Sequence, residues 1–338
     1  YWRVLASADQ FAGYVDWRPA AGPAGSLRAR FSRLDLPAAP DTPAGAQTPA
    51  ADAPRRMPAL DLVVDRLTLA GHALGRLEID AAHAPAGEAA AFWRLQRLRL
   101  SNPAAVLSAS GRWQPAAAGA PARMSADFGL ELADAGALLE RFGLPGVVQG
   151  GKGRLGGELA WSGSPLVPHT PTMTGRLYLD VGAGRFLKAD PGAARLLSVL
   201  SLQALPRRLA LDFRDVFQEG FMFEDVRGDI SVAYGVARTN NLRLRGLQAA
   251  ALMEGQADLT HETQDLRVLV VPEINAGTAS LVYAMINPAV GLGTFVAQLF
   301  LRQPLMQAGT REFRVTGTWD EPQVERIARS VEPAPATQ

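Results

Sequence analysis

The segment best suited to chemistry in this sequence is a glycine-rich stretch at residues 146–153. It reads Gly-Val-Val-Gln-Gly-Gly-Lys-Gly and comes closest to a phosphate-binding loop. No Ser or Thr follows Lys152 to hold magnesium, and a Pro-Gly turn precedes the stretch where such loops follow an apolar strand. A glycine-rich hairpin is therefore the better interpretation, and nucleotide binding is disfavoured.

The other candidates for chemistry are four histidines, His72, His83, His169 and His261. No two of them are three or four residues apart, and the chain has no cysteine, which excludes thiol chemistry and Cys-based zinc sites. Most acidic residues alternate with apolar ones, as a solvated sheet face requires. We therefore predict no catalytic residues, no metal site and no cofactor; a hydrolase or transferase is the least favoured alternative.

Composition indicates a folded, nearly neutral protein. The 338 residues are 48% hydrophobic and 20% charged, which is ample for a core and excludes disorder for the bulk of the chain. A net charge of +1 gives no field of the kind that nucleic acid binding requires, so we predict no nucleic acid partner. The first residues contain no initiator Met or signal peptide, and we expect any membrane anchor to lie outside this fragment.

Alternation of apolar and polar residues with period two dominates the chain and predicts strand after strand. Clear examples are residues 60–64, 76–80, 127–132, 176–181, 209–214 and 242–245. Short connections favour antiparallel neighbours. We predict a mainly β protein of about 16–18 strands in one long, curved antiparallel sheet that forms an open hydrophobic groove. The pattern slips by one residue at Asp65–Arg66 and again at Arg97, so alternation does not say which face is concave.

A few segments interrupt the strands. Residues 37–58 are rich in Pro and Ala and predict a disordered, exposed loop between strands. Helices are expected at residues 134–142, 190–205 and, as a broken pair, 278–303. Four strands end in a Trp followed by a turn, at Trp17, Trp113, Trp161 and Trp319, and a Trp in that position can cover the edge of an apolar face.

The apolar side chains of the strands are the candidate functional residues, because a sheet this long must fill or cover its apolar face. A continuous trough would suit acyl chains, with charged lipid heads left in water. Alternatively, the protein's own helices fill the face. The candidate lining residues are Leu62, Leu77, Ile79, Leu130, Leu177, Leu179, Leu211, Phe213, Phe223, Leu242, Leu244, Val268 and Val270.

The longest uncharged stretch, residues 274–301, is long enough to span a bilayer. It is interrupted by Asn287-Pro288 and two glycines, so a membrane span is the least favoured of three interpretations. The others are a helical pair that caps the sheet and a pair that dips into a membrane surface. The candidate membrane-contact residues are Leu281, Val282, Ile286, Leu292, Phe295, Leu299 and Phe300.

The second half of the chain resembles the C-terminal region of the YhdP family of AsmA-like bacterial envelope proteins, over residues 172–327. The segments that carry the resemblance are 197–209, 211–217, 219–221, 239–246, 253–255, 270–277, 287–293 and 310–317. Residues 1–171 are compatible but less distinctive.

This resemblance implies a periplasmic β-groove anchored in the inner membrane, which moves phospholipid toward the outer membrane and supports its permeability barrier. It implies groove strands over residues 1–171, a C-terminal groove end with capping or membrane-contact helices over 172–331, and a tail at 332–338. Phospholipids are then the expected ligand, and the inner leaflet of the outer membrane is the expected contact of the C-terminal helices. The alternative is a non-enzymatic structural or scaffolding envelope protein whose apolar face is self-filled.

Overall fold

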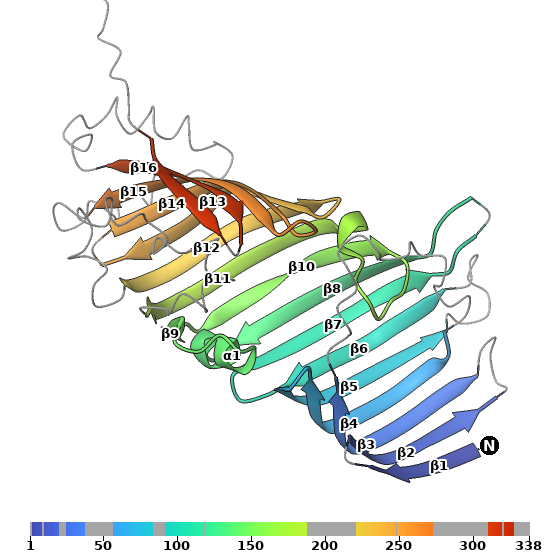
Figure 1. Cartoon of the computed structure of the whole chain (residues 1–338). Coiled ribbons are helices and arrows are strands. Elements are labelled where there is room, and N and C mark those ends of the chain that lie inside the picture. Colours follow the sequence, from blue (N-terminus) through green and yellow to red (C-terminus); the bar gives the residue numbers. More distant parts are fainter. Residues whose placement is uncertain are drawn as a thin grey trace, which may run out of the picture.

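The protein is one long, curved and twisted β-sheet of 17 strands that does not close on itself (Figure 1). This computed structural model describes residues 2–8, 10–19, 25–37, 57–83, 92–117, 119–187, 221–247, 249–272, 310–319 and 321–327. The long, mainly β sheet predicted from the alternation is confirmed, with 17 strands among the described residues, and the open, curved form agrees with the β-groove that the family resemblance implies.

The elements follow one another with short turns between most of them. The strands are β1 (Trp2–Ser7), β2 (Phe11–Arg18), β3 (Ser26–Leu36), β4 (Ala59–Leu69), β5 (His72–His83), β6 (Trp93–Ser101), β7 (Ala105–Gln114), β8 (Arg123–Leu132), β9 (Val148–Gly150), β10 (Gly153–Ser162), β11 (Thr174–Phe186), β12 (Phe221–Ala233), β13 (Val236–Gly246), β14 (Ala249–Asp258), β15 (Thr263–Pro272), β16 (Arg311–Thr318) and β17 (Pro322–Arg326). Within the described residues the helical elements are α1 (Ala135–Arg141) and one 3-10 turn, η1 (Thr170–Thr172).

One strand pair departs from the expected antiparallel order. β3 and β4 run parallel, with Ser26 opposite Ala59 and Leu36 opposite Leu69, whereas the other pairs of described strands are antiparallel. A parallel pair needs a connection of a dozen or more residues. The proline-rich stretch at 37–58 supplies that length; of this predicted loop, residues 38–56 lie outside the described residues, and Met57 at its end is buried.

The glycine-rich stretch is not the hairpin that the sequence suggested. β9 and β10 both pair with β11 in one continuous register, with Gly150 opposite Gly184 and Gly153 opposite Val181. The intervening residues keep the ladder, because Gly151 N–H donates to Ala183 O at 3.1 Å. Positive φ angles at Gly150 and Gly151 bend this interrupted strand without ending it.

Both slips in the alternation are β-bulges. The register shifts between Val64 and Leu67 on β4 and between Leu95 and Leu98 on β6, so apolar residues on either side of each bulge stay on one face. The predicted helix at 134–142 is confirmed as α1, where Asp134 accepts a hydrogen bond from Ala137 N–H as the N-cap. The predicted helices at 190–205 and 278–303 lie outside the described residues.

The sheet is continuous across the boundary that the sequence placed between residues 171 and 172. β10 and β11, on either side of it, are paired from Gly153–Val181 to Ala160–Thr174. The long edges of the sheet, at the strand ends, are called rims here. The tryptophan rim holds the ends of β5, β7 and β10, and the helix rim holds the opposite ends, beside α1 (Figure 1).

Candidate functional site

The apolar residues of successive strands lie opposite one another and form one continuous face, named here the trough face. The ladder runs from Leu62 opposite Ile79, through Ile79 opposite Leu98, and far along the sheet to Val268 opposite Phe313. Side chains that are directly opposite in a ladder project from the same side of the sheet. The register therefore shows which residues of successive strands share a face.

The described candidate lining residues all belong to this trough face. Leu179 lies opposite Leu155, Val226 opposite Leu244, and Leu242 opposite Met253. Two of the candidates, Leu211 and Phe213, lie outside the described residues, as do the seven candidate membrane-contact residues between Leu281 and Phe300.

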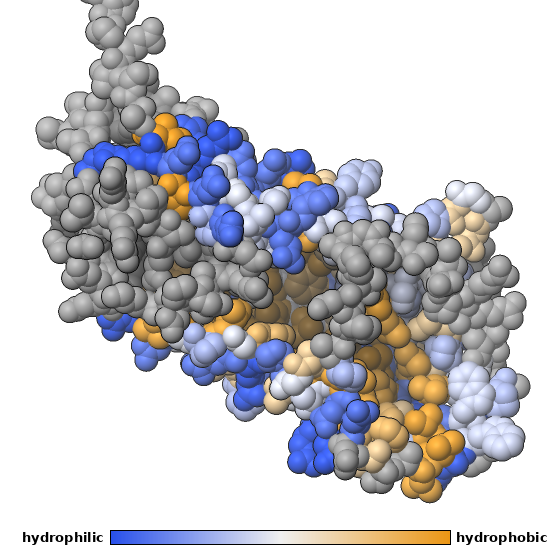
Figure 2. All heavy atoms as spheres, viewed as in Figure 1, coloured by the Kyte–Doolittle hydropathy of each residue, from blue (hydrophilic) through white to orange (hydrophobic). Residues whose placement is uncertain are grey.

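Between β4 and β11 the floor of the trough face is only half-buried, and this stretch is named here the open trough. Leu62, Ile79, Leu130 and Leu177 are each intermediate in exposure although their side chains are fully apolar. Figure 2 shows this hollow as a run of hydrophobic surface between more hydrophilic borders. Half-exposed leucines side by side leave an apolar surface that further apolar groups can cover.

Three tryptophans hold the tryptophan rim of the open trough. Trp93, Trp113 and Trp161 are between 1% and 7% exposed and pack in one cluster with Met124. Each indole N–H donates at 2.8 Å to a backbone carbonyl beyond the strand ends: those of Pro58, Gly163 and Ser164, respectively. These bonds let a large polar-tipped ring be buried and fasten the neighbouring loops to the rim.

On the helix rim, α1 covers the edge of the sheet. Leu138 and Leu139 of α1 pack against a cluster that includes Leu132 and Val147. Arg141 donates to Ala73 O at 3.2 Å and ties the helix to β5. Both long edges of the open trough are thus lined by packed protein, while its floor stays half-exposed.

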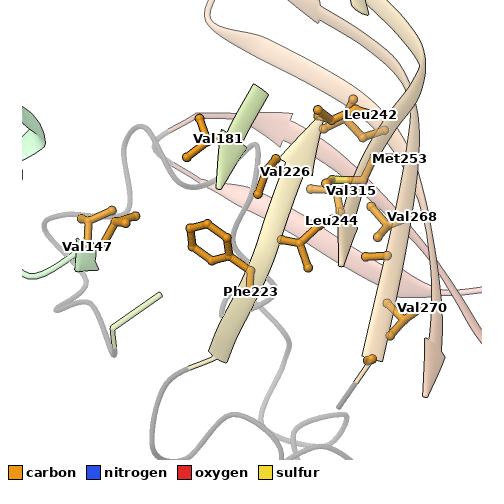
Figure 3. Packing of buried hydrophobic residues seen from close by; sticks show 14 of the residues in the cluster. Val147, Val181, Phe223, Val226, Leu242, Leu244, Met253, Val268, Val270 and Val315 are labelled. Atoms are coloured by element: carbon orange, nitrogen blue, oxygen red, sulfur yellow. The ribbon is translucent and has the colours of Figure 1, made fainter. Parts of the chain in front are cut away.

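From β12 to β17 the same face is packed shut, and this stretch is named here the closed end. Leu244, Val268, Phe313 and Val315 are each less than 8% exposed and belong to one cluster (Figure 3). Phe223 lies where this cluster meets β11, with its ring centroid 4.8 Å from that of Phe186. The sequence pattern is the same as in the open trough, but here the protein's own side chains occupy the space.

Charged side chains project from the opposite side, named here the outer face, where they form ion pairs. Arg314 donates two hydrogen bonds of 2.9 Å to Asp265, and Arg76 donates at 2.9 Å to Glu78. The bond from Arg314 lowers the pKa of Asp265, and the bond from Arg76 lowers the pKa of Glu78. These shifts reflect ion pairing on a solvated face, between β15 and β16 for Asp265 and Arg314 and within β5 for Glu78 and Arg76.

One hollow of about 1280 Å³ is lined by charged residues of the outer face together with Phe128, Leu177 and Ile230. Its walls carry Arg176, Arg238, Glu158 and Asp127. An acyl chain placed there would desolvate these charges without pairing them, which is costly. The chemistry of the trough face suits such a chain far better.

Two further properties of the described residues bear on function. They contain no group of three or more His, Cys, Asp or Glu side chains placed to hold a metal ion. No helix within the described part of the chain has the length and apolar character needed to cross a bilayer. The uncharged stretch at 274–301, for which a membrane span was one interpretation, falls outside that part.

Comparison with known proteins agrees with the trough geometry. The profile of the YhdP protein family matches residues 1–324. The chain belongs to the YhdP family. A curated relative, the intermembrane phospholipid transporter YhdP of Escherichia coli strain K12, is 31% identical over 173 residues, which is 51% of this chain and 14% of the relative. This YhdP-family chain therefore spans about one seventh of that relative's length, and no solved structure matches it.

In this YhdP-family sheet, sequence reasoning overlooked two polar groups, Gln264 and Trp319. Gln264 takes an apolar position in the alternation Gln264, Leu266, Val268, so the period-two pattern contained the signal. Trp319 was recognised only as a turn marker. Both groups lie at the tryptophan rim of the closed end and are taken up below.

Proposed function

We propose that this chain is a segment of an intermembrane phospholipid carrier, in which acyl chains lie on the open trough and polar head groups remain at the rim. The half-buried leucine floor between β4 and β11 is the observation that carries the proposal. Apolar area removed from water contributes about 25 cal/mol per Å², so covering this floor with acyl chains is favourable.

The dimensions of the trough support this assignment. Seven strand positions from β4 to β11 give six spacings and a floor about 29 Å long, at roughly 4.8 Å per spacing. The hydrocarbon core of a bilayer is about 30 Å thick, and it holds two acyl chains end to end. The open trough therefore has room for the chains of whole phospholipids, and the role needs no catalytic group.

The cellular setting is part of the same proposal. The name of the Escherichia coli relative places that protein between membranes, which supports a periplasmic position for this segment of an inner-membrane-anchored protein. The uncharged sequence at 274–301 supports contact with the inner leaflet of the outer membrane through residues 278–303, with Leu292, Phe295 and Leu299 at helical spacing. Such contact would serve the lipid balance and barrier of the outer membrane.

Leu177→Asp tests the proposal, because Leu177 lies on the floor between Gly157 and Ile230 and belongs to no packed cluster among the described residues. A carboxylate there faces the acyl chains, and we expect transfer of fluorescent phosphatidylethanolamine between vesicles to fall about tenfold or more. The matched control is Ser231→Asp, on the outer face and opposite Arg176, which should leave transfer unchanged.

The result that would overturn the carrier proposal is a purified wild-type chain that neither binds nor transfers phospholipid. Equal transfer by Leu177→Asp and wild type would also overturn it. Either result would favour the second candidate function, a scaffolding role. One observation supports that role: in the closed end this fold fills its apolar face with its own side chains.

A further inference from the structure

One buried side chain of the closed end has no polar partner. Gln264 is 5% exposed, and both its amide oxygen Oε1 and its amide nitrogen Nε2 are buried without a hydrogen bond. It lies on the trough face, because it shares the alternation of Leu266 and Val268 and stands opposite Ala257 and Gly317. Leaving such groups unpaired costs about 1–3 kcal/mol each, so an empty amide here weakens the fold.

A second unpaired group lies at the same rim. Trp319 N–H donates to Glu262 O at 2.8 Å, which continues the ladder between β15 and β16 past Thr318. Trp319 is therefore two residues beyond Gly317, the residue opposite Gln264. Its indole Nε1 is also buried without a partner. The three other described rim tryptophans, in contrast, each donate to a carbonyl.

The two side chains together present a defined set of hydrogen-bonding groups within an apolar wall. The donors are the amide of Gln264 and the indole N–H of Trp319, and the acceptor is Oε1 of Gln264. The ester carbonyls of a diacyl phospholipid accept hydrogen bonds, and they lie between its apolar chains and its head group. The ammonium group of ethanolamine supplies N–H donors for Oε1.

We propose that Gln264 and Trp319 form a polar anchor that binds the ester carbonyls of a phospholipid at the tryptophan rim of the closed end. The inference rests on the proposed function and adds the chemistry that orients the lipid there. The ester region lies at the rim.

The experiment compares two lipids that differ only at these carbonyls. The full chain is incubated with an equimolar mixture of ester-linked dipalmitoyl phosphatidylethanolamine and its ether-linked dihexadecyl analogue, and bound lipid is quantified by mass spectrometry. We expect the wild type to prefer the ester lipid about threefold to tenfold, the range of one or two net hydrogen bonds. Gln264→Leu and Trp319→Phe should each reduce this preference, and the double variant should abolish it.

The melting temperature distinguishes a binding residue from a structural one, because replacing a structural residue would lower it. Gln264→Leu replaces an unpaired amide with an apolar group of similar size, so the melting temperature of the lipid-free chain should rise by about 2 °C while ester preference falls. The matched control is Gln256→Leu, at an exposed outer-face position of β14, which should change neither quantity.

The outcomes separate the anchor from the carrier role. Phospholipid binding without ester preference in the wild type would overturn the anchor and leave the carrier proposal standing, with bound water as the partner of Gln264. Ester preference that persists in the double variant of Gln264 and Trp319 would also overturn the anchor proposal. A chain that binds neither lipid would overturn both proposals.

Discussion

The open trough and the closed end are built from the same alternating pattern but differ in what covers it. Leu177 and Leu130 on the floor between β4 and β11 are half-buried, whereas Leu244 and Val268 in the closed end are at most 5% exposed. Every one of them faces the same side of one sheet. The pattern of a strand therefore decides which face is apolar, but it does not decide whether that face is filled by protein.

The largest effect expected from this comparison is on folding. Leu244→Asp puts a charge into the packed cluster with Val226 and Ala251, and we expect the free energy of unfolding to fall by about 4 kcal/mol or more. Leu177→Asp should cost about 1 kcal/mol or less, because water reaches its position in the lipid-free chain. Urea unfolding of the two variants checks this; equal losses would contradict the division into open and closed regions.

A smaller effect is expected at the tryptophan rim of the open trough. Trp113→Phe keeps most of the ring but leaves the carbonyl of Gly163 without its donor, at a cost of about 1–2 kcal/mol. Hydrogen exchange should quicken around residues 163–173 and stay unchanged in the closed end. Trp2→Phe is the control, since Trp2 is 72% exposed. Faster exchange in β14 and β15 would instead indicate that the two regions open as one unit.

The smallest effect concerns an ion pair on the outer face of the closed end. The hydrogen bond from Arg314 lowers the pKa of Asp265 below its ordinary value of 3.8. A lowered folded-state pKa stabilises the fold above the unfolded value, and this contribution is lost as the pH falls through the folded one. Because both side chains are about half exposed, Asp265→Asn should cost less than about 1 kcal/mol at pH 7.

The same variant should lose its deficit relative to wild type below about pH 4, which acid unfolding at several pH values measures. Asp127→Asn is the matched control, because Asp127 is exposed on the outer face and makes no ion pair among the described residues. A deficit for Asp265→Asn that persists in acid would show that the side chain acts through packing.

Local features of this fold were readable from the sequence, whereas long-range ones were not. Alternation predicted the strands, and its slips at Asp65–Arg66 and Arg97 mark real bulges, because both depend only on neighbours in the chain. The parallel pairing of β3 with β4 and the continuity of β9 with β10 depend on contacts between distant segments. Leu179 and Leu244 were equivalent candidates in the sequence, yet Leu244 is a buried member of the closed-end cluster whereas Leu179 is only partly buried against it, a difference that depends on distant contacts.

The pairing of β3 with β4, the one parallel pair among the described strands, depends on the length of the linker that joins them. β3 ends at the helix rim and β4 begins at the tryptophan rim, so the chain between Pro37 and Met57 has to return across the full width of the sheet. A deletion that left only a tight turn would permit only an antiparallel partner, and β4 would then meet β3 in reverse. Strands β1–β3 would then run in the opposite direction relative to β4 and the strands that follow it. The length of the proline-rich stretch therefore sets the relative orientation of these two parts of the sheet.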